Sequence, residues 1–199
     1  MNHPELFIIP LLILSDYLLT VWGAVLSEKN YRQHFKIENY ELNPIWQKSI
    51  AQKRWFNPKF MGIVVLVIGF CFVWSNGWTE KDVFSEGLFG FFVILSTSLI
   101  AVHLSNILTF VYMARHPQSI SGEVEMSHLL ILKMAQFRSM GLVFVFIVIA
   151  IFSPTPFVIG GLVSQVFLSI LKLRWLAKAR AVEKKKNIPP KLYEQNTVI

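Results

Sequence analysis

Three ionisable side chains stand near the middle of separate long apolar runs: Asp16, His103 and Arg138. A charge near the centre of a bilayer costs on the order of 3 kcal/mol unless it is paired or hydrated. We therefore expect the three groups to meet one another rather than lipid, with an ion pair between Asp16 and Arg138. An acid, an imidazole and a guanidinium at similar depth could exchange protons or hold a small anion.

Other polar residues extend these positions along predicted helices. Thr20 lies four residues after Asp16, and Asn106 lies three residues after His103, so each shares a helix face with its partner. The functional interpretation is a polar stripe that faces the interior of a helical bundle, and the structural one is a set of groups that only joins helices. Lys133, which opens the fourth apolar run, could add positive charge to the cluster or extend toward the interface.

The segment Glu41-Leu42-Asn43-Pro44 follows the first apolar run after a polar stretch. Asn-Pro favours a turn, and Asn43 suits the cap of a short helix that starts at Pro44. Alternatively, the segment is a re-entrant or interfacial loop that brings Glu41 and Asn43 back over the cytoplasmic end of the bundle. Irregular backbone at membrane depth is tolerated only where it lines a cavity. The sequence leaves both interpretations open.

The two segments together carry a resemblance. Asp16-x3-Thr20 in a first span, followed by Glu41-x-Asn43-Pro44 before the second, resembles a pattern in small prokaryotic membrane proteins of unknown function. The resemblance covers the first two apolar runs and implies a helical membrane protein without a known activity. The chain departs from the pattern between the motifs, where its spacer is longer and more charged than the short glycine-rich link of that family.

Composition indicates a membrane protein. The chain has 199 residues, of which 54% are hydrophobic and 16% are charged, against about 25% charged in soluble domains. The mean hydropathy is +0.51. Apolar residues gather in five runs long enough to cross a bilayer, which predicts spans at about 6–26, 60–74, 88–113, 129–152 and 157–175. We expect an all-α integral membrane helical bundle over residues 1–180, followed by a basic, disordered cytoplasmic tail over 181–199.

The charges predict an orientation. The net charge is +7, and Lys and Arg collect in the first loop and the C-terminal tail, whereas the loops at 75–87 and 153–156 hold one basic residue between them. The positive-inside rule then places the N-terminus outside and the C-terminus in the cytoplasm. We expect a protein of the prokaryotic cytoplasmic membrane, with no nucleic-acid partner and with a tail that contacts anionic lipid headgroups.

Several kinds of site are disfavoured. The single cysteine, Cys71, excludes an intrachain disulfide and a cysteine-based zinc site, and the histidines lack metal-ligand spacing. We expect no metal and no cofactor. Neither a Gly-x-Ser-x-Gly elbow nor a His-Glu-x-x-His motif occurs.

Three classes of function remain open. The preferred one is a protein that binds or moves a small anion, a proton or a lipid headgroup at the polar cluster. The second is a scaffold or accessory subunit, in a homo-oligomer or with a partner subunit, whose helices approach closely at Gly87, Gly90 and Gly160-Gly161. The third is an intramembrane enzyme on a lipid-linked substrate, with Asp16 or Glu41 and His103 as acid and base.

Overall fold

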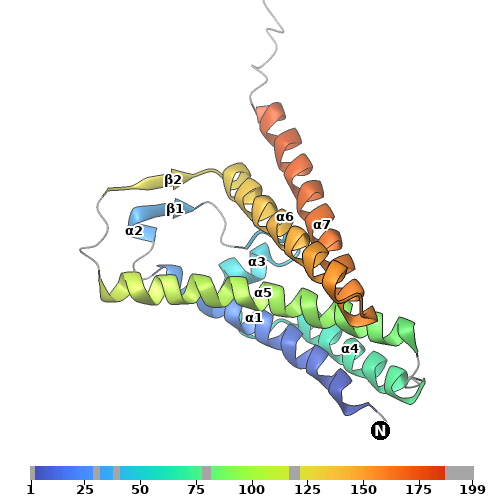
Figure 1. The fold of residues 1–199 in the computed structure, drawn as a ribbon. Coiled ribbons are helices and arrows are strands. Elements are labelled where there is room, and N and C mark those ends of the chain that lie inside the picture. Colours follow the sequence, from blue (N-terminus) through green and yellow to red (C-terminus); the bar gives the residue numbers. More distant parts are fainter. Residues whose placement is uncertain (1–2, 29–31, 38–40, 78–81, 117–121, 187–199) are drawn as a thin grey trace, which may run out of the picture.

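The computed structural model describes residues 3–28, 32–37, 41–77, 82–116 and 122–186. Within them, five helices are long and apolar enough to cross a membrane (Figure 1). A short 3-10 turn, η1 (Pro4–Phe7), leads into α1 (Ile8–Leu26). The other four are α4 (Pro58–Gly77), α5 (Val83–Arg115), α6 (His128–Phe152) and α7 (Pro156–Lys186). The described chain is thus mainly helical, as the composition predicted.

Local sequence signals fix where these helices begin. Asp82 caps α5, because its Oδ1 accepts hydrogen bonds from the backbone N–H of Phe84 at 3.0 Å and of Ser85 at 3.2 Å. Asn57 Oδ1 accepts from Lys59 N at 3.0 Å just where Pro58 starts α4. Helix α4 consequently starts at Pro58 and α5 at Val83, before residues 60 and 88, where the predicted spans begin.

The helices are arranged in a chain of neighbours. Helix α1 packs against α5 and α4, α5 packs against α7, and α7 forms a hairpin with α6. In Figure 1 this α6–α7 hairpin crosses α5 and leaves the group of α1, α4 and α5 at an angle. A dominant contact between α5 and α7 therefore joins the two parts of the bundle.

Glycines make that contact possible, as the sequence led us to expect. A Cβ placed on Gly160 would lie 1.8 Å from the carbonyl oxygen of Gly87, and one placed on Gly90 would lie 2.1 Å from that of Phe157. Side chains at these positions would force the two backbones apart. The close approach is typical of small-residue packing between membrane helices.

Two short strands depart from the all-α prediction. Strands β1 (Phe35–Ile37) and β2 (Val124–Met126) form a parallel pair with Phe35 opposite Val124. They bring the first and third loops together at one end of the bundle, which we call the β end. Two long helices, α4 and α5, separate these loops in the chain. If successive helices cross the membrane in opposite directions, the first and third loops lie on the same side, as they do here. Strands of three residues are too short to show a periodic pattern in sequence.

Helix α7 is longer than the fifth span predicted from hydropathy. Helix α7 continues to Lys186, beyond the expected end of the fifth span at residue 175 and into the region predicted to be disordered from 181. Its last turns are rich in Ala, Lys and Arg, which are strong helix formers, and no glycine or proline interrupts them before Pro189. Residues 187–199 of the predicted tail lie outside the described residues.

Candidate functional site: an acid and an imidazole between α1 and α5

The structure brings Asp16 and Thr20 of α1 together with His103 of α5. His103 Nε2 lies 3.3 Å from Asp16 Oδ1 and 3.0 Å from Thr20 Oγ1. Thr20 is buried, and the side chains of Asp16 and His103 are 27% and 16% exposed. Asp16 and Thr20 share one face of α1, as their spacing predicted. This face contacts His103, in the third of the predicted spans.

The hydrogen bonds of Thr20 assign the roles of the imidazole nitrogens. Thr20 Oγ1 donates to the main-chain oxygen of Asp16 at 2.7 Å, so its lone pairs face His103 Nε2. The nitrogen Nε2 then carries the hydrogen in the neutral ring and donates it to Thr20, while Asp16 Oδ1 lies close by without a hydrogen-bond partner among the described residues. Among the described residues, His103 Nδ1 is buried and has no hydrogen-bond partner. This second nitrogen is a free proton acceptor inside the bundle.

Glu41 belongs to the same neighbourhood. Its charge interacts electrostatically with Asp16, and its Oε1 accepts a hydrogen bond from Asn43 N at 2.6 Å. Removal from water raises the pKa of Glu41 from 4.5 to about 7, although backbone hydrogen bonds from Asn43 and Leu42 oppose the rise. A carboxyl group with this pKa gains and loses its proton near neutral pH.

The Glu41-Leu42-Asn43-Pro44 segment leads into a turn, and the short helix that follows begins at Gln47 rather than at Pro44. Asn43 Oδ1 accepts from Ile45 N at 3.1 Å, and the Asn43 carbonyl accepts from Trp46 N and Gln47 N, which starts the turn before α3 (Gln47–Ala51). The same segment also folds back onto α1, where α3 packs against it. Asn43 thus closes a turn before α3, within a loop that returns to the bundle, and the N-cap position of α3 is Trp46, without a side-chain cap hydrogen bond.

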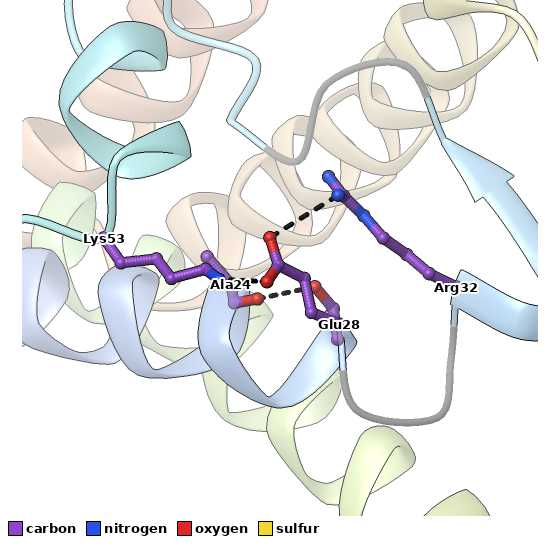
Figure 2. A network of polar contacts seen from close by, with 5 residues as sticks. Ala24, Glu28, Arg32 and Lys53 are labelled. Atoms are coloured by element: carbon purple, nitrogen blue, oxygen red, sulfur yellow. Dashed lines mark hydrogen bonds and ion pairs between the residues drawn. The ribbon is translucent and has the colours of Figure 1, made fainter.

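Three contacts hold this returning loop on α1. Tyr17 donates its hydroxyl hydrogen to the main-chain oxygen of Arg54 at 2.7 Å, and Ile50 is buried in a cluster that includes Tyr17. At the β end, Glu28 forms ion pairs with Lys53 and, at 3.5 Å, with Arg32. Figure 2 shows Glu28 between these two cations. The returning loop is therefore held on α1 at and just after the C-terminal end of α3.

The predicted Asp16–Arg138 ion pair does not form. Among the described residues, Asp16 pairs with His103, whereas Arg138 is exposed on α6 and lies near enough to repel Lys172 electrostatically. The reason is topological, because α6 packs mainly on α7 and not on α1. Lys133 lies on α6 with Arg138, outside the cluster. Asn106 is half-buried on α5, and no hydrogen bond joins it to Asp16, Thr20 or His103.

A second polar seam, between α7 and its neighbours, was missed in the sequence. Gln165 Nε2 donates to Ser98 Oγ on α5 at 3.0 Å. Facing α6, Gln136 Nε2 donates to Ser169 Oγ at 2.9 Å, and Lys172 Nζ donates to Ser139 Oγ at 2.6 Å and to the Ala135 carbonyl at 3.3 Å. The available signal was the spacing of Gln165, Ser169 and Lys172, which places them on one helix face at i, i+4 and i+7.

The described residues contain no group of three or more His, Cys, Asp or Glu side chains that could hold a metal ion. Comparison with family models, with curated proteins and with solved structures finds no match for this chain. The arguments about function therefore start from the geometry of the cluster.

Proposed function

We propose that this integral membrane protein binds and passes on protons at Asp16 and His103, with Glu41 linking the pair to the β end. The observation that supports this most directly is the contact of 3.3 Å between a carboxylate and an imidazole from two apolar helices. Intramembrane ionisable groups in contact with each other are typical of proton relays.

Proton transfer within the cluster can be written with these three side chains and water. A proton that reaches Glu41 can pass to Asp16, through water where the carboxylates do not touch, and then be shared with His103. The ring accepts a proton at Nδ1, which is unpartnered among the described residues, while Nε2–H stays hydrogen-bonded to Thr20 beside Asp16. The resulting imidazolium stands beside the Asp16 carboxylate, which offsets part of the cost of its charge.

The geometry supports a proton over a small anion. The cations that the sequence offered for binding an anion, Arg138 and Lys133, lie on α6. This helix packs mainly on α7 rather than on α1. The cluster itself offers two carboxyl groups, Asp16 and Glu41, and these would repel an anion. A cation other than a proton would need more oxygen ligands than these side chains supply.

The same contacts argue against an intramembrane hydrolase with Thr20 as its nucleophile. In a catalytic triad the acid and the nucleophile bind opposite nitrogens of the histidine ring. Here Asp16 and Thr20 both approach Nε2, and the Thr20 hydroxyl hydrogen is already donated to the Asp16 main chain. The histidine is therefore poorly placed to activate Thr20.

The proposed topology has the N-terminus outside and the β end in the cytoplasm, in a prokaryotic cytoplasmic membrane. The basic first loop, which forms part of the β end, supports this orientation by the positive-inside rule. In this orientation Glu41 faces the cytoplasmic mouth of the cluster.

The experiment is proton flux into proteoliposomes that hold a pH-sensitive dye and are driven by a potassium diffusion potential. We expect wild-type protein to carry protons, and Asp16→Asn and His103→Ala to reduce the flux to that of empty liposomes. Matched controls are Glu5→Gln, an exposed acid preceding α1, and His116→Ala, an exposed histidine that ends α5. Both controls should keep the wild-type flux. The proposal is wrong if wild-type vesicles do not exceed empty ones, or if all four variants match the wild type.

A second candidate, an accessory subunit, is supported by the tight glycine contact between α5 and α7. Under this alternative the polar groups only join the helices. Stable Asp16→Asn and His103→Ala variants would then keep their full effect on a partner complex in cells while the purified protein shows no proton flux.

A further inference from the structure

The hairpin of α6 and α7 carries an unbalanced charge. From residue 128 to residue 182 the chain contains six basic residues and no acidic ones. They are Lys133, Arg138, Lys172, Arg174, Lys178 and Arg180. Charge of one sign within and next to apolar helices requires counter-charge from outside those helices.

Two of these cations lie close together on neighbouring helices. Arg138 of α6 directly precedes Ser139, whose hydroxyl accepts a hydrogen bond from Lys172 Nζ of α7 at 2.6 Å, and the charge of Arg138 acts on Lys172. Lys172 Nζ donates only to neutral oxygens, those of Ser139 and Ala135, and neither cation forms an ion pair with a described residue. Arg138 is exposed on the helix surface that would face lipid. The part of the chain that the structure describes thus supplies no anion for this pair.

The depth of the pair matches one leaflet. Arg138 is 14 residues from the end of α6 at Phe152, and Lys172 is 16 residues from the start of α7 at Pro156. At about 1.5 Å per residue these positions lie roughly 21 Å and 24 Å from the α6–α7 turn. Hydrocarbon is about 30 Å thick, so long side chains at this depth reach the headgroups of the leaflet at the β end.

We propose that Arg138 and Lys172 hold the phosphate of an anionic phospholipid against the face shared by α6 and α7. The guanidinium can donate two parallel hydrogen bonds to phosphate oxygens, and the ammonium supplies a second positive charge from between the helices. Ser139 fixes the lysine, because its buried hydroxyl accepts from Nζ at 2.6 Å. The acyl chains would then lie along the exposed apolar residues of α6, such as Phe137, Met140 and Phe144.

This site is independent of the proton cluster, and the experiment leaves Asp16 and His103 unchanged. Protein in neutral detergent is mixed with phosphatidylglycerol or phosphatidylcholine, and bound lipid is counted by native mass spectrometry. We expect wild type to prefer phosphatidylglycerol, and Arg138→Gln and Lys172→Gln each to weaken that preference about five-fold. Lys178→Gln and Arg180→Gln, which remove exposed cations near the end of α7, should retain it.

Three results would overturn the proposal. Equal losses in the control variants would mean that the basic end of α7 attracts anionic lipid without a defined site. Displacement of the lipid by excess inorganic phosphate would mean that the pair binds the free ion. A preference unchanged in Arg138→Gln would rule out the site even if Lys172→Gln failed to fold, because Arg138 is exposed and its removal leaves the helix packing intact.

Discussion

Replacement of Glu41 by glutamine tests how the returning loop is coupled to protonation. The loop keeps this carboxyl group away from water, which raises its pKa from 4.5 to about 7. Glutamine removes the titration but retains an oxygen that can accept the hydrogen bond from Asn43 N, now 2.6 Å long. The variant therefore tests the effect of protonation while the hydrogen bond from Asn43 N is kept.

The pKa shift predicts both the sign and the size of the effect. Because the folded protein holds the proton of Glu41 more tightly than the unfolded chain does, the contribution to stability is complete below pH 4.5. It is lost as the pH rises through about 7. At about 1.4 kcal/mol per pKa unit, the loss between these limits is at most about 3.5 kcal/mol. Above neutral pH the ionised Glu41 lowers the free energy of unfolding of the wild type, and Glu41→Gln avoids that penalty.

The measurement is reversible unfolding in mixed micelles between pH 5 and pH 8. We expect the free energy of unfolding of the wild type to fall across this range relative to Glu41→Gln, with most of the change between pH 5 and pH 7. Glu125→Gln, which changes an exposed glutamate on β2, controls for the loss of one negative charge at the β end. Parallel pH curves for wild type and Glu41→Gln would refute the reasoning.

Two further substitutions test the packing. Gly160→Ala should cost about 3 kcal/mol in the free energy of unfolding, because its Cβ would lie 1.8 Å from the Gly87 carbonyl oxygen. Gly141→Ala, where a Cβ meets nothing within 4 Å, should cost nothing, and equal effects of the two would contradict the close contact of α5 and α7. Tyr17→Phe removes the hydrogen bond to the Arg54 carbonyl and should cost about 1 kcal/mol, whereas an unchanged unfolding curve would show that this bond does not hold the loop.

The sequence predicted the helices well because hydropathy and length decide which segments can cross a bilayer. It placed helix ends less well, since ends depend on single capping residues. Asp82 caps α5, which begins at Val83, five residues before the apolar run at residue 88 that predicted the helix. The position of Asp82 three residues before Ser85 is a local capping signal, and a hydropathy average over many residues does not detect it. The continuation of α7 beyond residue 181 has a similar cause, because helix propensity persists where hydropathy ends.

The convergence of Asp16, Thr20 and His103 was accessible from depth and helix periodicity, but the position of Arg138 was not. The depth of a residue along the membrane normal predicts which groups lie at the same level. It does not predict which helices are neighbours. Arg138 lies at a plausible depth for Asp16, yet α6 turns to α7, where Lys172 and Gln165 provide a seam of their own. Which helices are neighbours depends on packing surfaces such as the contact of Gly87 with Gly160. The sequence shows that these glycines permit a close helix contact, but it does not show which helix is the partner.

Helix α5 is the element that both polar regions share. It contacts α1 through His103 and α7 through Ser98, whose hydroxyl accepts from Gln165 at 3.0 Å. These two residues are five positions apart, so they point about 140° away from each other around the helix. The glycine contact with Gly160 holds the backbones of α5 and α7 so close that they cannot approach further. Helix α5 therefore joins the Asp16–His103 pair to the α6–α7 hairpin through contacts on different faces of one helix.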